Sequence, residues 1–130
     1  KKIEGLGGNM RLGGRDIQIK EDTLAWKIFG KKETVRRRFR HRYEVDPKYI
    51  DQIESAGMIF SGKAPNHPIM QVLELKDHPF FMGTQSHPEL SSRPLAPEPM
   101  FAGLVAEAMR KHYPDEKLPT CISAAKKVCK

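Results

Sequence analysis

The stretch Phe80-Phe81-Met82-Gly83-Thr84-Gln85-Ser86-His87-Pro88-Glu89 joins a short apolar run to a polar turn. An apolar run of this length, bounded by turn signals, is typical of a strand, here over residues 80–86. Pro88 has no N–H to give to a β-ladder, so the strand is expected to end before it. The stretch therefore predicts that His87 lies at the end of a strand, with Glu89 two residues further on.

This placement makes His87 and Glu89 a candidate acid–base pair. In open α/β sheets, active sites gather at the carboxyl ends of strands. A histidine that moves protons needs a carboxylate or a carbonyl to fix its tautomer and to stabilise the imidazolium. On His-Pro-Glu alone, however, a surface turn without any chemistry is the stronger interpretation. No convincing nucleophile lies beside the pair in the sequence.

The length of 130 residues suits one domain or a piece of one. No apolar run approaches the roughly 20 residues of a membrane span, and the first residues show no signal peptide. The two cysteines, Cys121 and Cys129, have no neighbouring histidine or cysteine that would suggest zinc, and the histidines show no ligand spacing. We predict no metal site, and we interpret the cysteines as free thiols of a cytoplasmic protein.

The charge is concentrated in one segment. Lys and Arg number 23 against 16 Asp and Glu, and seven of the positive side chains lie between Lys31 and Arg42, where Glu33 is the one acid. Such a cluster can bind phosphates, but more often it is a solvated face. A basic nucleic-acid-binding module is therefore an alternative. It is not favoured, because only Phe39 and Tyr43 supply aromatic rings and no binding motif is present.

Strand and helix signals alternate along the rest of the chain. Strands are predicted at residues 15–20, 43–45, 58–62 and 69–75. One helix is predicted to begin at Asp22 and to end at Gly30, and another to begin at Asp46-Pro47 and to end at Gly57. A last amphipathic helix is predicted over residues 100–112. Its expected inward residues are Phe101, Leu104, Val105, Ala108 and Met109.

Three segments together resemble one family. They are Gly-Gly-Asn-Met-Arg-Leu-Gly at residues 7–13, Arg-His-Arg-Tyr-Glu-Val at 40–45, and Gln-Ser-His-Pro-Glu at 85–89 followed by Ser-Arg-Pro at 92–94. In this order and spacing they resemble the C-terminal part of the glutaminase domain of the CTP synthase family, over about residues 5–113. His-Pro-Glu alone would indicate only the broader class I glutamine amidotransferases, whereas the other two segments narrow the resemblance to CTP synthases.

The resemblance implies an α/β fold. It is the C-terminal portion of a class I glutamine amidotransferase-like domain, with a central mixed, largely parallel sheet flanked by helices. Residues 1–113 are expected to form this incomplete part of the glutaminase domain, with the half that bears the nucleophile absent, and residues 114–130 a C-terminal tail. The late strands are expected to include antiparallel ones.

The resemblance also implies a function. CTP synthases aminate UTP to CTP with ATP hydrolysis, Mg²⁺ and L-glutamine, with GTP as activator, as cytoplasmic homotetramers. Their glutaminase domain releases ammonia by a Cys-His-Glu triad and passes it to a synthetase domain, which holds UTP and ATP. The family's triad histidine and glutamate correspond to His87 and Glu89. The arginine that binds the glutamine α-carboxylate corresponds to Arg42, which the composition of the basic cluster alone does not single out.

The family's nucleophilic cysteine lies upstream of residues 7–13, and Cys121 and Cys129 match no family position. We therefore expect the chain to be a C-terminal fragment of a longer enzyme, inactive on glutamine by itself and poorly stable when free. Four positions depart from the family pattern: Asn9 for Thr, Phe39 for His, Ser86 for an aromatic and Leu90 for Phe. Ser86 is expected to loosen the packing around His87. These departures leave open a degenerate, non-catalytic amidotransferase-like subunit.

Overall fold

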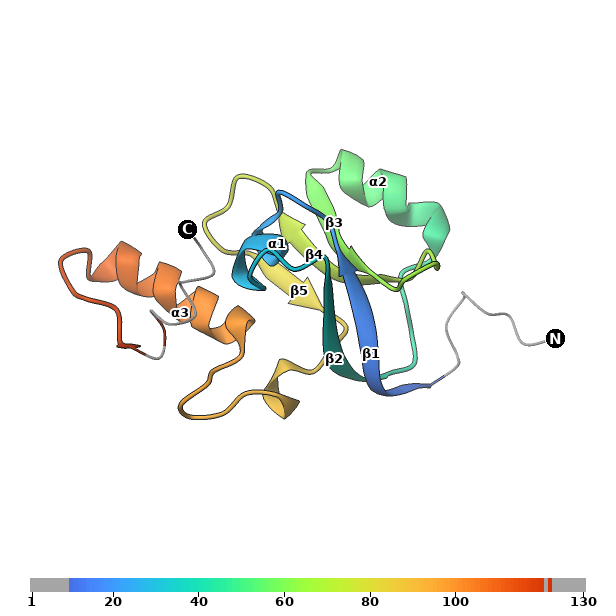
Figure 1. The fold of residues 1–130 in the computed structure, drawn as a ribbon. Helices are drawn as coiled ribbons and strands as arrows, with labels where there is room; N and C mark the ends of the chain where they lie inside the picture. The colour runs from blue at the N-terminus through green and yellow to red at the C-terminus, as the bar shows by residue number, and fades with distance from the viewer. Residues whose placement is uncertain (1–9, 121, 123–130) are drawn as a thin grey trace.

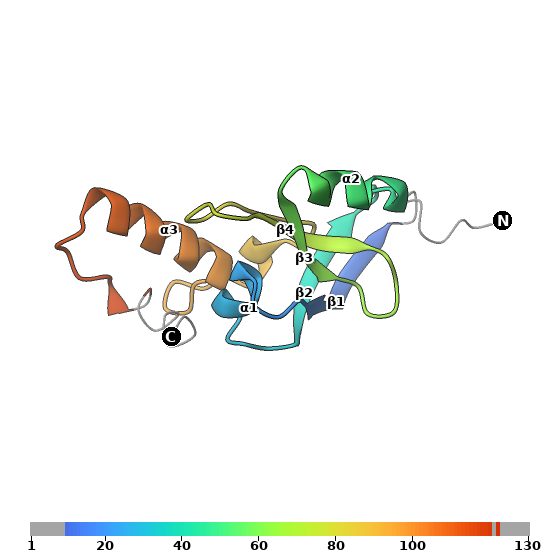
Figure 2. The same cartoon turned by 90° about the horizontal axis from the view of Figure 1, so that it is seen from above.

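A computed structural model describes residues 10–120 and 122, and its core is a five-stranded β-sheet with helices packed around it (Figure 1). The strands are β1 (Arg11–Ile19), β2 (Thr34–His41), β3 (Met58–Lys63), β4 (Met70–Leu75) and β5 (Met82–Thr84). The α-helices are α1 (Leu24–Ile28), α2 (Ile50–Ser55) and α3 (Pro99–His112), and two short 3₁₀ helices are η1 (Pro47–Tyr49) and η2 (Pro88–Leu90). Figure 2 shows α1 and α2 on opposite sides of the sheet, with α3 extending beyond α1.

The strand order is β2-β1-β3-β4-β5, and every pairing between these strands is antiparallel. The prediction of a largely parallel sheet is therefore wrong for the described residues, whereas antiparallel late strands are confirmed. The connections explain the difference. A parallel pair needs a crossover of a dozen or more residues, usually a helix. Only residues 64–69 join β3 to β4, and only residues 76–81 join β4 to β5.

The sheet is curled, so that its first and last strands approach each other. The chain just beyond β5 returns to β2, where Ser86 forms a bridge with Phe39. In the same place the His87 amide donates to the Arg38 carbonyl at 2.8 Å. The pairing of β1 with β3 is short, because it joins only Gln18–Ile19 to Gly62–Lys63. The curl is what brings His87 against β2.

Local signals account for most helix ends. The Asp46 side chain accepts from the Lys48 amide at 3.1 Å and Pro47 begins η1, as predicted. Gly30 and Gly57 follow α1 and α2 with φ of +79° and +98°, left-handed angles that suit glycine.

Two local predictions are wrong. Thr23 caps α1 instead of Asp22, because its hydroxyl accepts from the Trp26 amide at 3.1 Å. Residues 43–45 form no strand, since the pairing of β2 with β1 ends at His41 and the chain turns there.

The hydrophobic core lies between the sheet, α1 and the start of α3. Its buried members are Ile17, Ile19, Ala25, Ile28, Phe29, Val35, Phe39, Val72 and Met100. The buried Glu74 carboxylate ties α1 to β4, because it accepts from the amides of Leu24 at 2.8 Å and Ala25 at 2.9 Å. A carboxylate at a helix N-terminus satisfies amides that have no partner inside the helix.

The predicted inward face of α3 is wrong. Phe101, Leu104 and Val105 are 41%, 53% and 44% exposed, whereas Ala102 and Ala106 are buried. The inward face consists of the small residues Ala102, Gly103 and Ala106. Small residues are favoured there because α3 packs closely, and a Cβ on Gly103 would lie 2.5 Å from the Phe80 ring. The spacing of apolar residues located the helix, but α3 has apolar side chains on two faces. No helix among the described residues has the length and apolar character needed to cross a bilayer.

Candidate functional site

The candidate site is centred on His87 and Glu89, at the point where the chain leaves the sheet. His87 immediately precedes η2, and its Nδ1 lies 2.6 Å from Glu89 Oε1. The side chains are 33% and 57% exposed, respectively. With Nδ1 held by the carboxylate, Nε2 is the ring atom that can take or give a proton. The sequence predicted that these two residues act together, and the structure brings them together.

The strand before this pair is shorter than predicted. β5 ends at Thr84 and not at Ser86, because Ser86 and His87 pair with β2. Ser86 is buried, its hydroxyl lies 2.7 Å from Thr84 Oγ1, and its amide donates to the same oxygen at 3.0 Å. The Ser86 hydroxyl therefore has a partner within the protein, and the Ser86 backbone is the bridge partner of the buried Phe39 on β2.

The hydrogen bond from His87 lowers the pKa of Glu89 below its ordinary value, and the charge of Arg40 acts in the same direction. This side chain is therefore an anion at neutral pH. A carboxyl group whose pKa is lower in the folded protein contributes stability above its unfolded pKa. That contribution is lost as the pH falls through the folded pKa.

We expect His87→Ala to raise the pKa of Glu89 toward its ordinary value, because the substitution removes the main cause of the shift. The measurement is an NMR titration of the side-chain carboxyl carbons. Asp46 is an internal control, since its pKa is lowered chiefly by the Lys48 amide and should not move in this variant. An unchanged Glu89 titration in His87→Ala would contradict the described hydrogen bond.

Arg42 lies in the turn that follows β2 and is exposed. Among the described residues it makes no hydrogen bond and no ion pair, so its guanidinium is available to an incoming carboxylate. No bond joins it to His87 or Glu89, but the two segments are linked. Gln85 Nε2 lies 3.4 Å from the carbonyl oxygen of Tyr43, the residue after Arg42. The basic strand and the His-Pro-Glu turn therefore belong to one region of the molecule.

Two buried carboxylates near this region were not predicted from the sequence. Glu98 accepts from Arg37 Nε at 2.8 Å and from the Met100 amide at 2.8 Å, and so caps α3. Glu44 interacts with both Arg11 and His41. The Glu98-Pro99 pair at the start of α3 could have indicated that the Glu98 carboxylate caps this helix. For the buried Glu44 carboxylate, the only signal in the sequence was its position two residues after Arg42.

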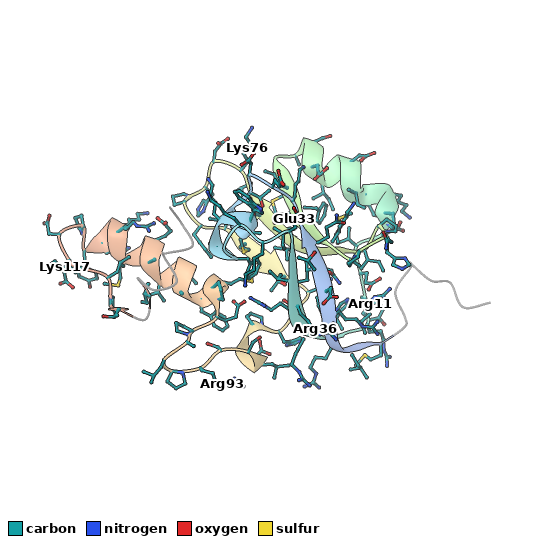
Figure 3. The ribbon with its side chains drawn as sticks, in the orientation of Figure 1. Arg11, Glu33, Arg36, Lys76, Arg93 and Lys117 are labelled. Atoms are coloured by element: carbon teal, nitrogen blue, oxygen red, sulfur yellow. The ribbon has the colours of Figure 1, made fainter. Side chains whose placement is uncertain are left out.

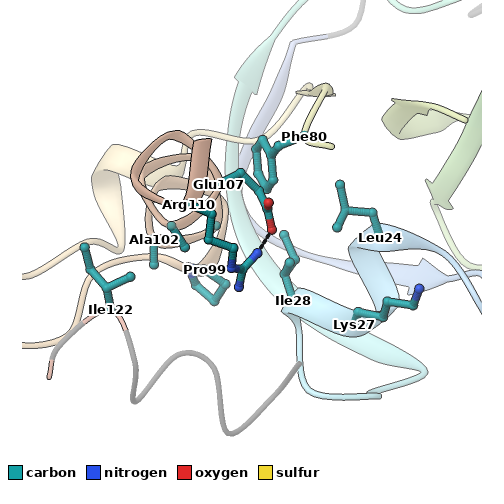
Figure 4. A pocket seen from close by; sticks show the side chains of 11 residues that line it. Leu24, Lys27, Ile28, Phe80, Pro99, Ala102, Glu107, Arg110 and Ile122 are labelled. Atoms are coloured by element: carbon teal, nitrogen blue, oxygen red, sulfur yellow. Dashed lines mark ion pairs between the residues drawn. The ribbon is translucent and has the colours of Figure 1, made fainter. Parts of the chain in front are cut away.

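A cleft of about 260 Å³ lies elsewhere, between α1 and α3 (Figure 4). It is lined by Leu24, Ile28, Phe80, Ala102 and Ala106, among others, and contains none of the predicted site residues. No group of three or more His, Cys, Asp or Glu side chains in residues 10–120 and 122 is arranged to hold a metal ion. Cys121, Cys129 and the Gly-Gly-Asn of residues 7–9 lie outside the described residues.

Comparison with known proteins gives consistent results. The pattern of the family described as "Glutamine amidotransferase class-I" matches residues 1–106. Proteins named CTP synthase are similar to most of the chain. The one from Methanospirillum hungatei is 49% identical over 108 residues, which are 83% of this chain and 20% of that protein. The one from Archaeoglobus fulgidus is 47% identical over 116 residues, or 89% of this chain and 22% of that protein.

A solved structure is similar as well. "Trypanosoma brucei CTPS - glutaminase domain with bound acivicin" matches with a TM-score of 0.72 and 30% identity, over 87% of this chain and 45% of that one. The chain thus spans about a fifth of the length of the curated relatives it matches.

Proposed function

Because the chain belongs to the class I glutamine amidotransferase family, we propose that it carries the histidine and glutamate of the glutaminase site of a CTP synthase. The observation that carries the proposal is the 2.6 Å contact between His87 Nδ1 and Glu89 Oε1. It occurs in a chain that is close to half identical to the corresponding part of CTP synthases. A histidine held at Nδ1 by a carboxylate can act as a base and then as an acid through Nε2.

In this proposal the nucleophile is a cysteine outside the described residues, none of which is a cysteine. His87 Nε2 takes the thiol proton, and the thiolate attacks the side-chain amide carbon of glutamine. The imidazolium then gives its proton to the departing nitrogen, so that the C–N bond breaks and ammonia leaves a thioester. His87 next takes a proton from water, whose oxygen attacks the thioester carbon. The C–S bond then breaks, the imidazolium returns its proton to the cysteine sulfur, and glutamate is released. Glu89 keeps the imidazole oriented and stabilises its charged form.

Arg42 has the proposed role of binding the α-carboxylate of glutamine. A guanidinium offers two parallel N–H donors to a carboxylate, a geometry that a lysine ammonium does not reproduce. The support is that Arg42 is exposed and lacks a partner among the described residues. Its neighbours Arg36 and Arg37 are instead paired with Asp16 and Glu98.

For the whole protein, we propose the glutamine-dependent amination of UTP to CTP with ATP hydrolysis. The ammonia released here would pass to a synthetase domain, with Mg²⁺ and GTP as cofactor and activator and a homotetramer as the assembly. Residues 10–120 and 122 contain no group of three or more His, Cys, Asp or Glu side chains that could hold a metal ion. The steps proposed for His87, Glu89 and Arg42 are those of glutamine binding and hydrolysis.

The test is to measure CTP formation by the natural polypeptide that contains this sequence, once with glutamine and once with ammonium chloride as the nitrogen source. We expect both to support synthesis, and we expect glutamine to be hydrolysed. Synthesis from ammonium without hydrolysis of glutamine would contradict the proposal and favour a degenerate amidotransferase-like subunit. Loss of both activities would contradict the assignment to a CTP synthase.

A further inference from the structure

Glu44 carries a buried carboxylate near the candidate site, because its side chain is only 2% exposed. Its two carboxylate oxygens both face Arg11. Oε1 accepts from Nε, and Oε2 lies 3.4 Å from Nη2. Oε1 also lies 3.2 Å from His41 Nε2. Arg11 and His41 are register partners on β1 and β2, so Glu44 contacts both strands at the same point. Figure 3 shows Arg11 on β1.

A carboxylate this buried is stable only if its charge is matched. Taking an ion out of water is energetically costly, and the cost is offset only by well-oriented partners. The Arg11 fork and the His41 ring provide them. The contacts of Glu44 with Arg11 and His41 therefore also hold in place the turn after β2 that contains Glu44. Removing one partner would leave a buried charge without compensation.

Arg42 lies inside this fixed turn. The chain is held at His41 by the β-ladder and at Glu44 by the ionic contacts, and only two residues lie between these points. The Arg42 backbone therefore has little freedom, although its side chain is exposed.

Hydrogen bonds also link this turn, through Tyr43, to the segment that contains His87. Tyr43 accepts a bond from Gln85, two residues before His87, and the His87 amide is bonded to β2 at Arg38. The distance between the proposed carboxylate-binding arginine and the proposed base is thus set by β2 and by the turn that Glu44 anchors.

We infer that Glu44 is a positioning residue for glutamine binding. It touches no reacting atom and acts through Arg42, by holding the backbone of the turn from which that side chain reaches the substrate. The inference rests on the proposed function, because it takes Arg42 as the group that binds the α-carboxylate. A displacement of about 1 Å in such a group can cost about 10²-fold in rate.

The test compares Glu44→Gln with wild type in the natural polypeptide. The Glu44→Gln substitution keeps the size of the side chain but removes the negative charge that pairs with Arg11. We expect the KM for glutamine to rise by about 10-fold or more, with a smaller change in kcat. The rate of CTP formation from ammonium should stay unchanged, because ammonium does not use the glutamine site. Arg11→Lys, which keeps the charge and loses the fork, should give a smaller rise in KM.

The matched control is Asp16→Asn. It breaks another ion pair between β1 and β2, that of Arg36 with Asp16, which is exposed and lies away from the turn. This variant should have the kinetic constants of wild type, because exposed ion pairs contribute little.

Three outcomes decide the inference. A selective rise in the KM for glutamine supports it. An unchanged KM overturns it, as does an equal loss of glutamine-dependent and ammonium-dependent synthesis, which is what a purely structural role predicts. If Glu44→Gln does not yield folded protein, Arg11→Lys decides by the same criteria. Failure of the proposed function looks different, because wild type itself would then hydrolyse no glutamine.

Discussion

Replacing His87 by alanine is expected to lower the rate of glutamine hydrolysis by about 10³-fold, within the range of about 10² to 10⁴ that general acid–base catalysis contributes. The proposed mechanism uses this imidazole in each proton transfer. Glu89 cannot replace it, because a carboxylate is a much weaker base than an imidazole even at the ordinary pKa to which Glu89 returns in this variant. CTP formation from ammonium should be unchanged, since that reaction bypasses glutamine hydrolysis.

The measurement is ammonia release from glutamine by the natural polypeptide, under saturating glutamine. The matched control is His67→Ala, which removes an exposed histidine from the β3–β4 connection without touching the candidate site. The control should behave as wild type. Equal activity of His87→Ala and wild type would show that the His-Pro-Glu turn takes no part in catalysis.

Replacing Arg42 by alanine is expected to raise the KM for glutamine by about 10²-fold, because a bidentate, charge-assisted pair contributes about 3 kcal/mol. Arg42→Lys should give an intermediate KM. The ammonium ion of lysine keeps the charge but cannot present two parallel donors. In both variants synthesis from ammonium should be unaffected.

The measurement is the dependence of ammonia release on glutamine concentration. Lys32→Ala is the matched control, since it removes an exposed cation near the opposite end of β2 and tests whether the net charge of the segment matters. An equal rise in KM in Arg42→Ala and Lys32→Ala would mean that the net positive charge of the segment, and not a specific contact with Arg42, attracts glutamine. An unchanged KM in Arg42→Ala would remove this residue from the site.

The sequence predicted well those features that depend on neighbouring residues. Asp46-Pro47 and Gly57 mark helix ends because a capping side chain, a fixed φ and a left-handed angle are properties of single positions. The pairing of His87 with Glu89 is likewise local, with one residue between the partners. Resemblance to a family was needed to single out Arg42 among the arginines of its cluster.

Most of the features that were missed depend on contacts between distant segments, although the shift of the α1 cap from Asp22 to Thr23 is local. The curl of the sheet rests on the bridge between Phe39 and Ser86, which no local pattern indicates. The contacts of Glu44 with Arg11 and of Glu98 with Arg37 join residues 33 and 61 positions apart. Their acids look like ordinary surface charges in the sequence.

The inward face of α3 was missed for a related reason. The more hydrophobic side chains of α3 are those of Phe101 and Leu104, and a sequence pattern therefore places them inward. The close approach of Phe80 to Gly103, however, leaves room on the inward face only for small side chains such as Ala102 and Ala106.

The most direct test of the central claim is the ratio of glutamine-dependent to ammonium-dependent CTP formation, measured in wild type and in His87→Ala under saturating substrates. The proposed role of His87 predicts that this ratio falls by about 10³-fold in the variant while the ammonium-dependent rate stays constant. A ratio that is the same in both proteins would contradict the account, whether both rates persist or both decline together.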